Sequence, residues 1–165
     1  MGEKPNLTRD TASEAERQRQ LRSLLAYYAV LKGLGLDKEV LVRQVDIVWE
    51  QSGRGVAEAM KKVLKLGESL EDACATTLAV AQVFGIEIGE TEIGKRVTVT
   101  RCPVFEIGRN SGFEKERCLA PCLVFNDSVA KAFDPKFSVK RTMAIPQGDN
   151  VCEALWVMER CDGQA

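Results

Sequence analysis

The stretch "FSVKRTMAIPQGDNVCEALWVME", residues 137–159, decides the fold. Its first part alternates in character, and one side of the expected strand carries Val139, Arg141, Met143 and Ile145. The residues "PQGDN" have the composition of a turn, and "VCEALWVME" then resumes as a strand. We therefore predict an antiparallel hairpin whose second strand opens near Cys152.

The same alternation occurs upstream in "KRVTVTRCP", residues 95–103, which predicts a half-buried strand ending at Cys102. The segment before it, "GIEIGETEIG", fits either a short pair of strands or a linker. Between this strand and the hairpin, "APCLVFNDSVAKAF" has helical character, with Pro121 at the first helical position, where its missing N–H costs nothing. Cys122 then falls in the first turn of that helix.

The first half of the chain is helical in pattern. A helix is expected from residue 11, and Asp37 can cap a second helix that "SGRG", residues 52–55, should end. A short third helix and a fourth helix capped by Ser69 follow. Helices over residues 11–84 and strands over residues 95–158 predict an α+β fold, with helices packed on one face of an antiparallel sheet.

Length and composition fit one soluble domain spanning residues 1–165, with residues 1–10 expected to be disordered. The chain has 23 basic and 24 acidic residues and a formal net charge of -1, so we expect neither a nucleic-acid nor a membrane partner. Because the first 20 residues lack the apolar core of a signal peptide, we expect a cytoplasmic protein. A small molecule is the expected partner, and a homodimer stays open.

The chain has six cysteines and no histidine. Cys74 has the surroundings of a core residue, and Cys161 lies in a charged tail. The remaining four are Cys102, Cys118, Cys122 and Cys152. Four thiolates can hold zinc or an iron–sulfur cluster, although the spacing of Cys118 and Cys122 is looser than the common C-x2-C. The alternative is that two or more of them are core residues, or that the site holds no cofactor.

Any catalysis without histidine must use thiolates, carboxylates, lysine, tyrosine or bound water. Cys122 is the cysteine most easily activated, because a helix N-terminus stabilises a thiolate. The carboxylates nearest to the cysteines in sequence are Asp127, Asp149, Glu106 and Glu114. Asp149 is the candidate base, with the simpler alternative that it only shapes the turn.

Residues 95–158 resemble the L-2-amino-thiazoline-4-carboxylate hydrolase family. The resemblance rests on the order of "RCP" at Cys102, "CLAPC" at Cys118 and Cys122, Asp127, "FSVKRT" from Phe137, and "GDNVC" ending at Cys152. The last hairpin is also similar to the end of 4-vinyl-reductase-type domains, which are small-molecule-binding modules. The helical half carries no matching motif.

The resemblance implies a cysteine-dependent hydrolase that opens a ring at a small amidine or thiazoline-like carbon–nitrogen bond. Cys122 would attack while an aspartate such as Asp149 handles protons, or cysteine thiolates would hold a metal whose bound water attacks. Arg109 or Arg141 would hold a substrate carboxylate. The alternative is a metal- or small-molecule-binding sensor module without turnover, because a shared fold does not choose between the two.

Overall fold

The computed structural model describes residues 37–110 and 122–159, together with individual residues between 16 and 35. Residues 1–10, which the sequence predicts to be disordered, lie outside the described residues. The residues that are described between 16 and 33 are helical, in agreement with the first expected helix. In the part of the chain that is described, no helix combines the length and the apolar character needed to cross a membrane.

Helix α2 (Lys38–Leu64) begins where the sequence predicts, because the Asp37 side chain accepts a hydrogen bond from the N–H of Glu39 over 2.8 Å. The predicted break at residues 52–55 is wrong, since α2 continues through both glycines. Gly53 is buried where α2 passes α5 (Cys122–Phe133), and a Cβ atom there would lie 2.7 Å from the carbonyl oxygen of Phe125. The glycine is therefore a close-packing position within one helix and not a helix end.

Helix α3 (Leu70–Val83) is capped by Ser69, as expected, through a bond of 3.1 Å from the N–H of Asp72 to the serine hydroxyl. Cys74 on this helix is fully buried in the core cluster, which confirms its expected place. Strand β1 (Glu87–Glu92) follows and pairs with β2 (Arg96–Arg101), so the ambiguous segment forms a strand and a turn.

The sheet contains four antiparallel strands in the order β1-β2-β4-β3, where β3 is Phe137–Met143 and β4 is Cys152–Met158. This confirms the predicted hairpin. The strand predicted to run to residue 145 is too long, since a bulge follows Arg141 and a 3-10 turn covers Ile145–Gln147. Arg141 pairs with Ala154 before the bulge. After the bulge, Met143 pairs with Glu153, and these two residues lie on the opposite face of the sheet from Arg141 and Ala154.

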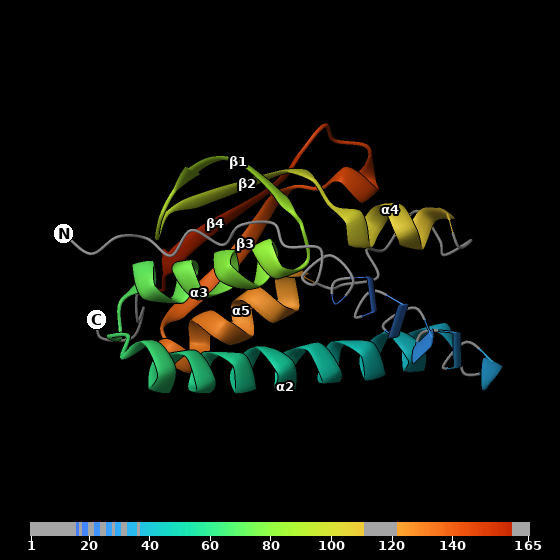
Figure 1. Cartoon of the computed structure of the whole chain (residues 1–165), viewed down its shortest axis with the longest axis horizontal. Helices are drawn as coiled ribbons and strands as arrows, with labels where there is room; N and C mark the ends of the chain where they lie inside the picture. The colour runs from blue at the N-terminus through green and yellow to red at the C-terminus, as the bar shows by residue number, and fades with distance from the viewer. Residues whose placement is uncertain are drawn as a thin grey trace, which may run out of the picture.

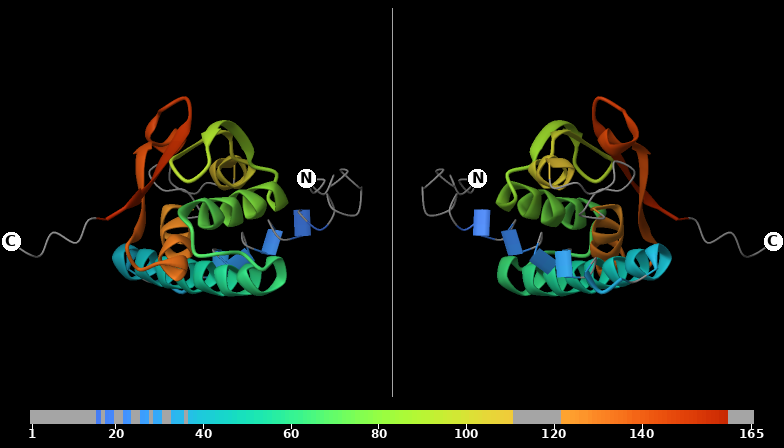
Figure 2. Two further views of the ribbon diagram at one scale, coloured as in Figure 1. Left: turned by 90° about the vertical axis from the view of Figure 1, so that its left-hand side faces the viewer. Right: turned by 90° about the vertical axis from the view of Figure 1, so that its right-hand side faces the viewer.

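The elements stack in three layers, as Figures 1 and 2 show: the sheet, then α3 and α5, then α2. Helix α5 contacts both β3 and α2 and is the centre of this arrangement. Its Phe125 meets Trp49 of α2 edge to face, with ring centroids 6.0 Å apart. The short helix α4 (Pro103–Asn110) lies beyond the end of β2. The α+β layout with helices on one face of the sheet is confirmed.

Candidate functional site

A pocket opens between α3, α5 and the helix-covered face of the sheet, with a volume of about 120 Å³. Val97 and Val99 of β2 and Ala154 of β4 form its floor on the sheet. Phe125 of α5 and Trp49 of α2 contribute aromatic rings. The pocket therefore lies inside the core, where side chains are held by packing on several elements.

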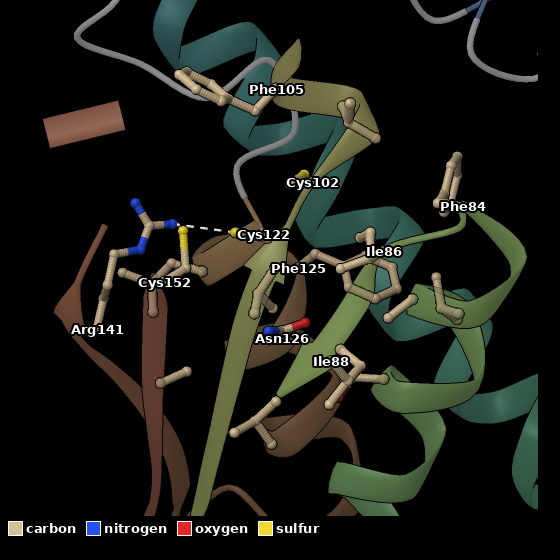
Figure 3. A pocket seen from close by; sticks show the side chains of 18 of the residues that line it. Phe84, Ile86, Ile88, Cys102, Phe105, Cys122, Phe125, Asn126, Arg141 and Cys152 are labelled. Atoms are coloured by element: carbon tan, nitrogen blue, oxygen red, sulfur yellow. Dashed lines mark hydrogen bonds between the residues drawn. The ribbon is translucent and has the colours of Figure 1, made fainter. Parts of the chain in front are cut away.

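Three of the predicted cysteines line this pocket, and each comes from a different element. Cys102 follows β2 and directly precedes α4, and its carbonyl accepts a hydrogen bond from the N–H of Glu106. Cys122 is the first residue of α5 and Cys152 is the first residue of β4. The pairing of Val99 with Cys152 puts both on the same face of the sheet. In Figure 3 the three sulfur-bearing side chains point into the same space.

Arg141 enters the pocket from β3, immediately before the bulge that lies between Arg141 and Met143. Its guanidinium donates a hydrogen bond of 3.3 Å to Sγ of Cys122, drawn as the dashed line in Figure 3. Among the described residues, no carboxylate lies within ion-pair distance of Arg141. A half-buried guanidinium without a carboxylate favours an anion beside it. The geometry therefore favours a thiolate at Cys122, at the positive end of α5.

The Cys152 thiol, unlike that of Cys122, is held in its neutral form by its surroundings. The N–H of Ile145 donates to its Sγ over 3.3 Å. Burial raises the pKa of the Cys152 thiol above its ordinary value, and the nearby sulfurs of Cys122 and Cys102 raise it further, against the opposing effects of the Ile145 N–H and Arg141. Cys152 is therefore a neutral thiol near neutral pH, beside a Cys122 that is bonded to a cation. Such a pair can supply a nucleophile and a proton donor.

The predicted carboxylates have structural contacts instead of places in the pocket lining. Asp149 accepts the N–H of Ala144 over 2.7 Å and closes the turn before β4. Asp127 accepts the N–H of Val139 over 3.0 Å and pairs with Lys131. Glu106 accepts two bonds from Arg101. Each of these carboxylates is thus engaged within the protein.

Several predicted residues lie outside what the structure describes. Cys118 and Glu114 are outside the described residues. The backbone of Arg109 belongs to α4, and its side chain is not among those described.

The described cysteines fit a metal site poorly. Within residues 37–110 and 122–159, no three side chains of the metal-ligating types form a group able to hold an ion. The guanidinium of Arg141 also occupies one side of the Cys122 sulfur, where its positive charge opposes a cation.

Asn126 was missed by sequence reasoning. It lies one helical turn after Cys122, and both side chains face the pocket. No described residue forms a hydrogen bond with its side-chain amide. An asparagine on a helix with both polar and apolar residues is commonly a surface residue. The one sequence signal for Asn126 was its position four residues after Cys122, which places both side chains on the same face of the helix.

The fold and the site define an α+β protein with a cysteine-lined pocket of small-molecule size. The family model described as L-2-amino-thiazoline-4-carboxylic acid hydrolase matches residues 16–156, and the chain belongs to this family. The match covers the helical half from residue 16 onward, as well as the motifs from Cys102 to Cys152. A comparison with curated proteins found no match.

Proposed function

We propose that this protein is a cysteine-dependent hydrolase that opens a thiazoline-type ring, with Cys122 as the nucleophile. The observation that carries the proposal is the bond from Arg141 to Sγ of Cys122 at the first residue of α5. Guanidinium and helix N-terminus both stabilise a negatively charged sulfur. Membership of the thiazoline hydrolase family supports a ring of this kind as the substrate.

In the first step the Cys122 thiolate attacks the carbon of the ring C=N bond, forming a carbon–sulfur bond. The electron pair of the C=N bond moves to the ring nitrogen, which takes the proton of the Cys152 thiol. The nitrogen lone pair then reforms the C=N bond, and the ring sulfur leaves as a thiolate. The product is an S-linked adduct on Cys122 with an open ring.

In the second step water adds to the same carbon and gives a proton to the Cys152 thiolate. The bond to Cys122 breaks and returns the thiolate, while the hydroxyl proton passes to the released substrate sulfur. The net reaction adds one water, and both cysteines return to their starting states. The raised pKa of Cys152 suits this role, because the group must hold its proton until the ring nitrogen needs it.

Two further residues complete the proposed site. Arg141 has other N–H groups besides the one that contacts Cys122, and these suit a substrate carboxylate. The Asn126 amide can hold the ring nitrogen in place, because it faces the same space one turn along α5.

The test is ring opening by purified wild-type protein and by Cys122→Ser, Cys152→Ser and Cys74→Ser variants, followed by loss of thiazoline absorbance. We expect Cys122→Ser to abolish turnover, and Cys74→Ser to retain it because Cys74 lies in the core away from the pocket. Mass spectrometry of quenched wild-type reactions should find the adduct on the peptide that begins near Cys122. Full activity of Cys122→Ser would overturn the proposal.

The alternative, a small-molecule-binding module without turnover, is favoured by the apolar lining of the pocket. It predicts saturable binding of thiazolines with no ring opening by any form of the protein. The same assay, run beside a binding measurement, separates the two functions.

A further inference from the structure

Cys122 and Cys152 are unlinked in the structure, and both are half-buried, so a small solute can reach their sulfurs through the pocket. One short stretch of chain contacts both sulfurs. The Arg141 guanidinium donates to Sγ of Cys122 over 3.3 Å, and the N–H of Ile145 donates to Sγ of Cys152 over 3.3 Å. In Figure 3 both side chains point to the side of the pocket that the Arg141 guanidinium occupies.

These two cysteines form a pair from which the third pocket cysteine, Cys102, stands apart. No three described side chains of the metal-ligating types form a group able to hold an ion, so the three sulfurs do not converge on one point. Burial is the main cause of the raised pKa of the Cys152 thiol, and among the sulfurs Cys122 raises it more than Cys102 does. This order agrees with Cys122 as the nearer neighbour of Cys152.

The two paired sulfurs differ in reactivity. The bond from Arg141 and the start of α5 favour a thiolate at Cys122, whereas Cys152 keeps its proton. A thiolate is oxidised by peroxides to a sulfenic acid, which condenses with a neighbouring thiol to a disulfide. A water molecule needs a probe volume of about 10–15 Å³, so a pocket of about 120 Å³ admits hydrogen peroxide.

We propose that Cys122 and Cys152 are a site of reversible oxidation, at which hydrogen peroxide oxidises Cys122 and Cys152 closes a disulfide with it. The linkage itself does not depend on the proposed function, whereas its effect on turnover rests on that function. Because the disulfide removes the nucleophile and the proton donor together, it stops ring opening until a thiol reductant restores both groups.

The oxidation uses the same two sulfurs in the same roles. The Cys122 thiolate attacks one oxygen of hydrogen peroxide, which forms a sulfur–oxygen bond and breaks the oxygen–oxygen bond. The leaving hydroxide takes the proton of the Cys152 thiol and becomes water. The Cys152 thiolate then attacks the Cys122 sulfur, and a second hydroxide leaves and takes a proton from solvent. The two sulfurs are oxidised together by two electrons, and the peroxide is reduced to water.

Forming the sulfur–sulfur bond, which is about 2.0 Å long, requires both sulfurs to leave their present donors. Each cysteine side chain can move by rotation about its χ1 bond. The Arg141 guanidinium and the Ile145 N–H are released in this movement, and both are recovered when the disulfide is reduced.

The test treats reduced protein with stoichiometric hydrogen peroxide, blocks the remaining thiols with N-ethylmaleimide, and maps disulfides after tryptic digestion without reductant. The tryptic peptide of residues 118–131 carries both Cys118 and Cys122, so fragmentation of the linked peptides must assign the sulfur. We expect a linkage from Cys122 to Cys152 in the peptide of residues 142–160. Ring opening should fall in proportion to the linked fraction and return after treatment with dithiothreitol.

Three variants separate the roles of the groups. Cys152→Ser should form no such linkage, and peroxide should carry its Cys122 on to the sulfinic acid, which dithiothreitol does not reverse. Cys102→Ser is the matched control from the same pocket and should give the wild-type linkage. Arg141→Met should form the linkage about tenfold to a hundredfold more slowly, because the thiolate loses its charged donor. A thermal melt of each reduced variant checks that it remains folded.

The outcomes separate this inference from the proposed function. A linkage through Cys102 or Cys118, or sulfinic acid at Cys122 of the wild type without a disulfide, overturns the inference, and ring opening by the reduced protein would leave the proposed function standing. The expected linkage in a protein that opens no ring when reduced supports the site of oxidation and overturns the proposed function. The expected linkage without loss of ring opening overturns the control of turnover. Loss and recovery of turnover with the linkage supports both.

Discussion

Arg141 on β3 and Cys122 on α5 are joined by a hydrogen bond from guanidinium to sulfur of 3.3 Å. They are 19 positions apart in the chain, and the contact joins an edge strand of the sheet to the helix that covers it. The bond gives the sulfur a fixed cationic neighbour without histidine. The charge state of the Cys122 sulfur should therefore depend on the Arg141 guanidinium.

Replacing Arg141 by methionine should slow both turnover and alkylation of Cys122. A hydrogen bond to a charged group contributes about 1.5–3 kcal/mol, so the rate with iodoacetamide at neutral pH should fall about tenfold to a hundredfold. Peptide mass mapping after timed quenching gives the rate at Cys122 alone. Lys140→Met is the matched control, since its side chain is exposed, and it should react as the wild type does. An unchanged alkylation rate in Arg141→Met would show that the guanidinium does not activate the sulfur.

The pH profile of kcat/KM should lose activity on its alkaline side as Cys152 gives up its proton. The pKa of the Cys152 thiol is raised above the ordinary 9.0, mainly by burial, so the protonated form persists to higher pH than in a free cysteine. A group that acts as a proton donor works below its pKa and fails above it. In Cys152→Ser this alkaline limb should move upward or disappear, because a serine hydroxyl does not ionise in this range. An identical limb in both proteins would assign the proton to another group.

Gly53 and Gly55 of α2 should respond in opposite directions to substitution by alanine. The added Cβ at Gly53 would lie 2.7 Å from the Phe125 carbonyl oxygen, so the helices must separate, at a cost of about 1–3 kcal/mol in the free energy of unfolding. At Gly55 nothing lies within 4 Å, and alanine should stabilise the helix by about 0.5–1 kcal/mol. Urea titrations of the two variants measure both effects. Equal stability of the two would refute the close packing of α2 on α5.

Substitutions at Asp149 distinguish a turn residue from a catalytic base. Asp149→Asn keeps an oxygen that can accept the N–H of Ala144, so both stability and turnover should stay near the wild-type values. Asp149→Ala leaves that N–H unsatisfied at a buried residue, which should cost about 1–3 kcal/mol of stability. Steady-state kinetics and thermal melts of the two variants provide the comparison. Loss of turnover in the asparagine variant with normal stability would restore a catalytic role for the carboxylate.

Local patterns predicted the elements that local chemistry controls. Alternation identified the hairpin, and the side chains of Asp37 and Ser69 marked helix starts that the structure confirms. The break predicted at residues 52–55 was wrong because a glycine can either end a helix or allow another element to pack closely. The position of α5 shows that Gly53 allows close packing. Sequence spacing alone could not separate these uses.

The site was predictable in part for the same reason. The places of Cys122 at a helix start and Cys152 at a strand start follow from local signals. The contact between Cys122 and Arg141 depends on how α5 packs on the sheet. Local sequence patterns do not reveal that packing, so the contact could not be predicted. Asn126 could not be predicted as a site residue, because its role depends on the pocket that its side chain lines.

The bulge after Arg141 bears on how members of this family can vary in length. Pairing of β3 with β4 fixes Arg141 opposite Ala154, and pairing of β2 with β4 fixes Cys152 opposite Val99. Residues inserted between 144 and 151 would enlarge the turn and leave both partners in register. A single insertion within β4 would rotate the following side chains to the opposite face of the sheet. Natural variation in chain length should therefore collect in this short window and be absent on either side of it.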